Sequence, residues 1–582
     1  MATVAQRLTD LVQQAAEAAG YGDAPVPLEA CVPTHDPRHG DYQSNFAFRL
    51  GKALRTNPRA VAQQIVDALP DDPLIGAAEV AGPGFLNFRL DDAALAADVT
   101  ARATDPRLGA PPEGEGRTMV IDYSSPNIAK RMHVGHMRST IIGNAIDRMY
   151  RFLGWHVVAD NHLGDWGTQF GKLIVGWHDW RDDAAYAEDP IGELQRIYVE
   201  FGKRAAAAPT LEHRARAETA KLQEGDPDNL ALWQQFTEVS LREFDEVYDR
   251  MDVHFDVAHG ESFYREGLQD LVQELIDQGV ASTDQGAVVI RFDPEDGKGL
   301  KDASMLIRKS DGAALYGTTD LATVRYRLAT WHPERIVYVT DVRQRLHFRQ
   351  LFAACRKLGL DVDLEHVWFG MLRFADGTVV ATRKLEASQS AGPRSANLVD
   401  VLDTAVAHAR SVVDAKSEEL PEAERAQIAA AVGIGAIKYA DLSQNPQSDI
   451  IFDWDKMLSL EGNTAPYLMY AYARVQSIFR KGGIEGFEPG GLVLGEPIER
   501  ELALAVVRTP ELVQAAAASY RPNLVCDHLF GLANTFARFY HECRVLDDDP
   551  AVRRSRLTLC QATARALATG LDLLGLRALD RM

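Results

Sequence analysis

The segment from Ser124 to Asp147 constrains the fold more than any other part of this 582-residue chain, and it reads S-S-P-N-I-A-K-R-M-H-V-G-H-M-R-S-T-I-I-G-N-A-I-D. It follows the run T-M-V-I-D-Y, whose β-branched and apolar residues are typical of a buried strand, and Pro126 then ends the hydrogen-bonded ladder. From Arg138 onward, apolar residues recur at helical spacing. Strand, turn and helix in this order predict a parallel sheet with a ligand site at the carboxyl ends of its strands.

Two histidines, His133 and His136, stand at the predicted start of this helix. The helix dipole and free backbone N–H groups favour an anion there, and two imidazoles could donate to phosphate oxygens as charge builds on them. Gly135 would let a nucleotide approach the backbone closely. The same residues also fit a pair of capping or metal-binding histidines, so this short motif alone leaves both interpretations open.

Helical and strand patterns divide the chain into parts that together predict an α/β fold. A small α/β unit ends near Leu108, where G-A-P-P-E-G-E-G-R has the composition of a linker. A parallel-sheet domain with a long, charged helical insertion follows, and helices take over after about Ala396. The expected ranges are 1–108 for the N-terminal α/β domain, 117–395 for the sheet domain with its insertion at about 180–256, 396–460 for a helical connector and 461–582 for an all-α helix bundle.

Polar side chains also follow other predicted strands. Tyr316 and Asp320 stand four residues apart on the approach to a helix, and Gln344 follows the apolar run R-I-V-Y-V-T-D. Polar residues at two strand ends can converge on one ligand. Asp320 could instead be a simple helix cap, because Asp is a favoured residue at helix starts.

A further strand, H-V-W-F-G-M-L, ends at Gly370 and Met371, where an exposed backbone could pair with a flat heterocycle. The basic stretch V-V-A-T-R-K-L-E-A-S-Q-S follows and contains Arg383 and Lys384. Mobile cations there could clamp a triphosphate during transfer. An ordinary solvated surface loop explains the same basic pair.

The C-terminal helices combine aromatic and basic residues. Tyr467, Tyr470 and Arg474 share approximate helical spacing, which suits the stacking of unpaired RNA bases. A core stripe of tyrosines with a solvated arginine face is the alternative. The net charge of −21 argues against a general polyanion surface, although the last 50 residues contain eight arginines and six acidic residues. Polyanion binding would therefore be local.

Cysteine usage and hydropathy indicate the compartment. The five cysteines lie far apart and form no C-x-x-C pair, which argues against a disulfide framework and a structural metal site. The N-terminus lacks a signal-peptide core, and no apolar run is long enough to span a bilayer. We therefore expect a cytoplasmic protein with no bound metal and with neither a membrane nor DNA as partner.

Five ordered motifs, taken together, resemble the arginyl-tRNA synthetases of class I. The motifs are S-S-P-N-I-A-K-R-M-H-V-G-H, N-H-L-G-D-W-G-T-Q-F-G, L-Y-G-T-T-D-L-A, D-V-R-Q-R-L-H-F and the closing L-D-L-L-G-L-R-A-L-D-R-M. The resemblance covers nearly the whole chain and includes H-G-D-Y-Q-S-N-F-A-F, which looks like that family's additional N-terminal domain. It implies a tRNA-contacting N-terminal domain, a Rossmann-like catalytic domain and an α-helical anticodon-binding domain.

The resemblance implies a two-step ligase reaction. Arginine and ATP, with Mg²⁺ as the counter-ion of the nucleotide, would give arginyl-adenylate and pyrophosphate. The arginyl group would then pass to the 3′ end of tRNA(Arg). The resemblance further implies that activation requires this tRNA and that the enzyme is a monomer.

The resemblance also assigns roles to residues of this sequence. The implied catalytic residues are Lys130, His133, His136, Arg383 and Lys384. The implied ATP-binding residues are His133, Gly135, His136, Gly370 and Met371. The implied arginine-binding residues are Ser125, Asn127, His133, Tyr316, Asp320 and Gln344. The implied tRNA-binding residues are Tyr467, Tyr470, Arg474 and Met582. The chemistry of the arginine pocket agrees, because a planar guanidinium pairs with a carboxylate and a flat neighbour.

One motif departs from the family pattern. The lysine-rich second signature of class I enzymes corresponds here to V-A-T-R-K, with Ala381 where its first lysine is expected. The family tolerates this loss when a lysine lies just before the histidine motif, and Lys130 stands there. We therefore predict that Lys130 carries the charge on the pyrophosphate side, with Arg383 or Lys384 assisting.

Three other functions fit parts of the sequence. A catalytically inactive RNA-binding paralogue would retain the C-terminal helices but has no need of an intact histidine motif. An adenylyltransferase that makes a small cofactor without tRNA leaves those helices unexplained. A class I synthetase for another amino acid is the third alternative, and it depends chiefly on Asp320.

Overall fold

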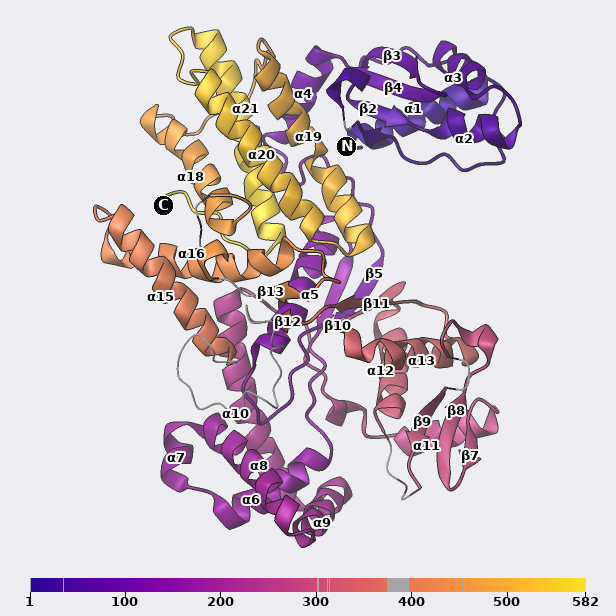
Figure 1. The fold of residues 1–582 in the computed structure, drawn as a ribbon, viewed down its shortest axis with the longest axis vertical. Helices are drawn as coiled ribbons and strands as arrows, with labels where there is room; N and C mark the ends of the chain where they lie inside the picture. Colours follow the sequence, from indigo (N-terminus) through magenta and orange to yellow (C-terminus); the bar gives the residue numbers. More distant parts are fainter. Residues whose placement is uncertain are drawn as a thin grey trace. The chain divides into compact units, whose positions relative to one another are not determined.

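The computed structural model describes residues 2–34, 36–300, 303–310, 312, 315–373, 397–451, 454–457, 459 and 461–582. Their contacts divide the chain into two compact units, whose elements are labelled in Figure 1. The first unit combines Met1–Glu113 and Phe152–Gly154 with Ser459–Met582, and the second combines Gly114–Arg151 with Trp155–Leu458. Both ends of the chain therefore belong to one unit, and the four-part division expected from the sequence remains a prediction.

The second unit is built around a four-stranded parallel sheet, as the sequence predicts. The strand order is β11-β10-β5-β6, and each neighbouring pair is parallel. Its strands carry buried valine and isoleucine because both faces of such a sheet are covered. Three strands end in an aspartate at the carboxyl edge, where ligands of parallel sheets bind. The bounds are β5 Thr118–Asp122, β6 His156–Asp160, β10 Arg335–Asp341 and β11 Asp363–Phe369.

Helices and a small antiparallel sheet complete the second unit. Helix α5 connects β5 to β6, and the stretch with the predicted helical insertion consists of helices. A buried apolar cluster, which includes Val120, Leu275, Ile290 and Leu321, packs the sheet β7-β8-β9 and helices α11–α13 against the parallel sheet. The bounds are α5 Val134–Phe152, α6 Thr168–Trp180, α7 Asp183–Glu188, α8 Pro190–Ala207, α9 Thr210–Glu224, α10 Pro227–Met251, α11 Leu268–Asp277, β7 Ser282–Asp284, β8 Ala287–Arg291, β9 Ser304–Arg308, α12 Tyr316–Trp331, α13 Arg345–Lys357, β12 Leu372–Arg373, α15 Leu398–Lys416, α16 Glu422–Leu442, β13 Ile450–Ile451 and α17 Trp454–Met457.

The first unit joins an N-terminal α/β domain to the predicted C-terminal helix bundle. The N-terminal sheet is antiparallel with the order β1-β2-β4-β3, and α18–α21 form the bundle. Helix α19 ties the two together: Arg500 makes a bidentate ion pair with Asp41 at 2.7 and 2.8 Å, and buried Tyr42 donates to Glu511 at 3.0 Å. The bounds are α1 Val4–Ala18, β1 Val32–Pro33, β2 Tyr42–Ser44, α2 Phe46–Ala53, α3 Pro58–Asp67, β3 Ile75–Ala81, β4 Phe85–Leu90, α4 Asp92–Arg102, α18 Ala465–Lys481, α19 Pro497–Ser519, α20 Asn523–Glu542 and α21 Pro550–Leu573.

Candidate active site

A cavity of about 310 Å³ lies where β5, β10 and β11 end, against the first turn of α5. This is the edge at which the sequence predicts a ligand site. Eight of the predicted site residues line the cavity, and they are Ser125, Asn127, His133, Gly135, His136, Gln344, Gly370 and Met371. The fold thus brings together residues from three strand ends that are up to 246 positions apart in the sequence, since Ser125 and Met371 face the same space.

The histidine pair is held by the backbone of its own helix start. Helix α5 begins at Val134, so His133 precedes it and His136 lies in its first turn. The N–H of His133 donates to Nδ1 of His136 at 3.2 Å, and the N–H of Gly135 donates to Nδ1 of His133 at 2.9 Å. Because both Nδ1 atoms accept, each ring carries its proton on Nε2. The two rings stack with their centroids 3.9 Å apart.

These hydrogen bonds show that two of the interpretations that the motif left open, capping and phosphate binding, do not exclude each other. Both imidazoles accept hydrogen bonds at the helix start and therefore cap it. The backbone N–H groups of His133 and Gly135 are thus occupied, although the sequence predicted that they would be free. Capping uses only Nδ1 and leaves an Nε2–H on each ring to donate to another group. Capping and phosphate binding are therefore compatible in the same pair.

The electrostatic environment keeps both histidines neutral. Burial, together with the charges of Lys130 and Arg343, lowers the pKa of His133 to about 4. Burial, together with His133 and Lys130, lowers the pKa of His136 well below its usual range. At neutral pH the pair therefore offers N–H donors without positive charge.

The His133 ring gives a reason for a glycine at position 135 in addition to the predicted approach of a nucleotide. A Cβ at this position would lie 2.6 Å from Cε1 and 2.7 Å from Nδ1 of His133. The close approach to the Gly135 backbone is thus made by the His133 ring, and the glycine is what allows that ring to accept from its N–H.

The expectation of an exposed backbone at the end of β11 is wrong. The N–H of Gly370 donates to the carbonyl of Pro446 at 3.0 Å, and its carbonyl accepts from the buried Arg138 at 2.6 Å. The N–H of Met371 donates to Asp449 at 2.8 Å. Both residues line the cavity, so what they offer a heterocycle is surface to pack against rather than free pairing groups.

Asp320 is not among the residues that line the cavity, and it does not cap a helix. Helix α12 begins at Tyr316 after the N-cap Leu315, which places Asp320 one turn inside the helix. Its Oδ2 pairs with Nε2 of His347 in α13 at 2.6 Å. Burial lowers the pKa of His347, but the hydrogen bond and charge of Asp320 outweigh it, so the net pKa is raised. His347 lies one turn beyond Gln344, the cavity residue that precedes α13, and this joins Asp320 to the cavity wall.

The sequence interpretation missed Glu261. This residue begins the short 3₁₀ helix Glu261–Tyr264. Burial, followed by the negative charges of Asp320 and Asp165, raises the pKa of Glu261 to about 8. Two carboxyl groups that repel each other would strongly favour a cation beside them. The run G-E-S-F-Y contains no pattern that predicts a binding residue at Glu261. The unusual pKa of Glu261 depends in part on Asp320, which lies 59 residues further along the chain.

Among the described residues, the predicted Tyr316 and Lys130 are also absent from the lining of the cavity. Tyr316 is largely exposed at the start of α12, one helical turn from Asp320. The ammonium of Lys130 lies 4.3 Å from the ring centroid of Tyr198, and Lys130 is not among the residues that line the cavity. Arg383, Lys384 and the rest of the V-A-T-R-K stretch lie outside the described residues.

The predicted RNA-binding residues of α18 divide between two environments. The hydroxyl of Tyr467 donates to Asn534 of α20 at 2.6 Å, which ties this tyrosine to the bundle. Tyr470 is exposed, and the guanidinium of Arg474 lies 4.7 Å from its ring centroid. Met582 lies partly exposed at the end of the chain. Tyr470 and Arg474 are therefore the pair that could stack on a base.

Comparison with known proteins identifies the family. The family model for the catalytic domain of class I (R) tRNA synthetases matches residues 99–454, and an arginine–tRNA ligase of Fusobacterium nucleatum is 44% identical over 588 residues, covering all of both chains. The chain belongs to the arginyl-tRNA synthetases. The models for the arginyl tRNA synthetase N terminal domain and the DALR anticodon binding domain match residues 6–90 and 468–582.

Solved structures of arginyl-tRNA synthetases share this fold. The enzyme of Thermus thermophilus is 26% identical with a TM-score of 0.83, and that of Plasmodium falciparum is 26% identical with a TM-score of 0.82; both alignments cover all of both chains. An arginine–tRNA ligase of Chromobacterium violaceum is also 42% identical over 586 residues, with full coverage of both chains. The predicted family, fold class and activity are thus confirmed: the chain is an AMP-forming arginine–tRNA ligase.

Proposed function

We propose that the cavity holds ATP and the backbone end of arginine, while the guanidinium reaches Asp320 and Glu261. The observation that carries this proposal is the pair of neutral imidazoles, each with an Nε2–H, in a cavity lined by Ser125 and Asn127. Such donors bind phosphate oxygens, and the polar side chains suit the α-amino and α-carboxylate groups. The carboxyl groups of Asp320, which pairs with the half-buried His347, and of Glu261 suit a guanidinium, whose fork of donors matches carboxylate geometry.

In the first step, an oxygen of the arginine carboxylate attacks the α-phosphorus of ATP, and the bond to the bridging oxygen of pyrophosphate breaks. Negative charge grows on the phosphate oxygens, where His133 and His136 donate. In the second step, a hydroxyl of the terminal ribose of tRNA attacks the arginyl carbonyl carbon and AMP leaves. Mg²⁺ would travel with the triphosphate; within the part of the chain that the structure describes, no three His, Cys, Asp or Glu side chains gather to hold a metal.

The proposed function is tested by exchange of labelled pyrophosphate into ATP. We expect the purified full-length chain to catalyse this exchange only when both arginine and tRNA(Arg) are present, and to accept lysine at least 10³-fold less well because an ammonium leaves the acceptors of the pocket unpaired. Absence of exchange with the cognate tRNA would favour an inactive RNA-binding paralogue. Exchange that needs no tRNA would contradict the proposed tRNA dependence.

Oligomeric state and location are proposed from the family resemblance. We propose a monomer that acts in the cytoplasm, with the exposed Tyr470 and Arg474 contacting the tRNA. None of the described helices combines the length and the apolar character needed to cross a membrane. Light scattering at micromolar concentration would test the monomer, and filter binding to tRNA with the Tyr470→Ala variant would test the contact.

We expect arginine binding to be coupled to the release of a proton from Glu261. Burial is the main reason that the pKa of Glu261 is raised to about 8, and the negative charges of Asp320 and Asp165 also contribute. A guanidinium stabilises the carboxylate, so the pKa falls in the complex and affinity rises with pH between the two values. Titration calorimetry should show several-fold tighter binding at about pH 8 than at about pH 6, with proton release seen as a dependence on buffer ionisation enthalpy.

The Glu261→Gln variant is the matched control, because it keeps the shape of the side chain and removes its titration. We expect the variant to bind arginine more weakly than the wild type and to lose the pH slope. Wild-type affinity that stays constant or falls between about pH 6 and about pH 8 would contradict the role of Glu261.

The Lys130→Ala variant tests the predicted charge on the pyrophosphate side. Lys130 is close enough to lower the pKa of both histidines, although its ammonium lies over Tyr198. We expect a fall in the activation rate of about 10²-fold with little change in the KM of arginine. Lys172 is a suitable control, since it also lies over an aromatic ring, at 5.5 Å from that of Phe201. An activation rate for Lys130→Ala equal to that of Lys172→Ala would overturn the assignment.

A further inference from the structure

Arg327 lies on the same face of α12 as the predicted guanidinium residue. Asp320 and Arg327 are seven residues apart, and two turns of an α-helix place such residues one above the other. The Asp320 side chain is partly accessible and pairs with His347, whereas Arg327 is fully buried. One face of α12 thus presents an acid toward the amino-acid site and a cation toward the interior of the unit.

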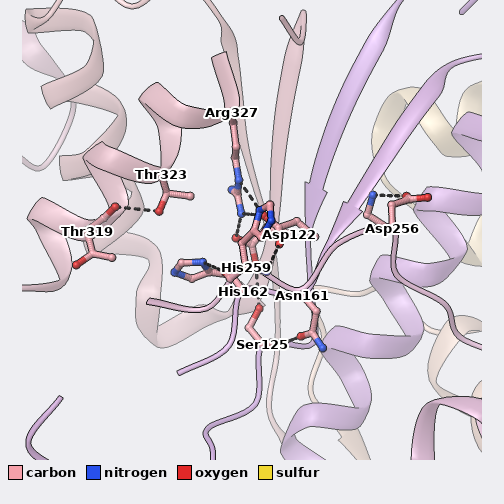
Figure 2. A network of polar contacts seen from close by, with 11 residues as sticks. Asp122, Ser125, Asn161, His162, Asp256, His259, Thr319, Thr323 and Arg327 are labelled. Carbon is pink, nitrogen blue, oxygen red and sulfur yellow. Dashed lines mark hydrogen bonds and ion pairs between the residues drawn. The ribbon is translucent and has the colours of Figure 1, made fainter. Parts of the chain in front are cut away.

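The guanidinium of Arg327 bridges the ends of two neighbouring strands, and Figure 2 shows it beside Asp122 at the end of the first. Its Nη2 donates to Oδ2 of Asp122 at 2.7 Å and to Oδ2 of Asp160 at 2.8 Å. These aspartates are the last residues of β5 and β6 and face each other in register. A buried cation between two buried carboxylates has a strongly preferred position, because any displacement leaves a charge unpaired.

Each of these carboxylates uses its second oxygen to hold a segment of the proposed amino-acid site. Oδ1 of Asp122 accepts from the hydroxyl of the cavity residue Ser125 at 3.0 Å (Figure 2). Oδ1 of Asp160 accepts from the backbone N–H of His259 at 3.3 Å, two residues before Glu261. The bridge therefore connects three segments: the helix with Asp320, the turn with Ser125 and the segment with Glu261.

We propose that Arg327 is a positioning residue that sets the distance between the two ends of the bound amino acid. The proposal rests on the proposed function, in which Ser125 lies at the backbone end of arginine and Asp320 with Glu261 at the guanidinium. Arg327 contacts no substrate, because its side chain is fully buried. It determines how long a side chain fits between the two ends, since a misplacement of about 1 Å is enough to impair a reacting geometry.

The Arg327→Lys variant tests this proposal through chain-length preference. A lysine keeps the charge but lacks the second donor, Nε, with which Arg327 also contacts Oδ2 of Asp160 at 3.3 Å. Aminoacylation would be measured with arginine and with its homologues one methylene shorter and one methylene longer. We expect the ratio of kcat/KM for arginine to that for the longer homologue to fall at least tenfold, while the KM of ATP changes less than twofold.

The Arg102→Lys variant is the matched control. Arg102 is also fully buried and pairs with a carboxylate, that of Asp98, but it belongs to the first unit. Loss of a buried arginine should lower the Tm of both variants, and only Arg327→Lys should change the chain-length ratio. A ratio that stays within twofold of the wild type in folded Arg327→Lys would overturn the proposal and leave a purely structural role.

A second variant keeps the test decisive if Arg327→Lys does not fold. Asp122→Asn removes one charge of the bridge but retains an oxygen that can accept from Ser125, and we expect a change of at least threefold in the same ratio. An unchanged ratio in this variant would overturn the proposal. The proposed function fails separately: in that case the wild type shows no arginine-dependent activity, whereas failure of the present inference leaves wild-type activity and its loss in Asp320→Asn intact.

Discussion

We expect the Asp320→Asn variant to lower kcat/KM for arginine by about 10²–10³-fold, because a neutral amide cannot pair with the guanidinium of the substrate. Removal of one partner of a desolvated charge pair costs roughly 3–4 kcal/mol, which corresponds to this factor. The KM of ATP should change little, since the histidine pair and Gly370 line the cavity, whereas Asp320 is not among its lining residues. Steady-state aminoacylation with arginine and ATP varied separately measures both quantities.

Asp363→Asn provides the matched control for this variant. Asp363 pairs with Arg335 at the start of β11, and its side chain is largely exposed. We expect loss of this ion pair to leave kcat/KM for arginine within twofold of the wild-type value. If Asp320→Asn retained more than a third of wild-type kcat/KM for arginine, the guanidinium would have to bind elsewhere.

The His136→Ala variant should lower kcat of activation by about 10²–10³-fold, the usual effect of removing one donor to the charge that grows in a transition state. The KM of arginine should change less than threefold, because the lost N–H is directed at the phosphates. Rapid-quench measurement of arginyl-adenylate formation separates this step from transfer to tRNA. Burial holds the pKa of the neighbouring His133 at about 4. Titration of His133 should therefore cause no inflection in the plot of the wild-type activation rate against pH above about pH 6.

His528 offers a control for the removal of a buried neutral histidine. Burial lowers the pKa of His528 to about 4, and its Nε2 lies 2.9 Å from the hydroxyl of Thr509 in the first unit. His528→Ala should lower the Tm without changing the rate of activation. A comparable loss of rate in both variants would show that the effect of His136→Ala arises from destabilisation and not from catalysis.

Much of the candidate site could be predicted because its signals are local. The strand, the break at Pro126 and the helical periodicity after Arg138 are all contained in one short segment, and together they require a parallel sheet with His133 and His136 at its edge. The carboxylate of Asp320 and the aromatic ring of Tyr316 are the groups that a guanidinium pairs with, so their residue types alone suggest an arginine pocket. For His133, His136 and Gln344, which line the cavity, the rule that parallel strands end at one edge was enough, whereas the roles of Asp320 and Tyr316 stay predictions.

What could not be predicted depends on partners far away in the sequence. Gly370 follows a strand with every sign of an open end, yet its N–H donates to Pro446. Glu261 stands out only once Asp320 is seen to share its environment. The orientation of the His133 ring, which explains Gly135, depends on side-chain torsions that spacing does not encode.

The assembly of the first unit from both ends of the chain has a consequence for synthesis on the ribosome. The N-terminal domain emerges first, but Asp41 and Tyr42 find Arg500 and Glu511 only after more than 450 further residues have been translated. Throughout that interval the face that α19 will cover is open to solvent, and its contacts have the high contact order that slows folding. The second unit is contiguous in sequence apart from three residues, so it can fold before the two terminal parts of the first unit have come together.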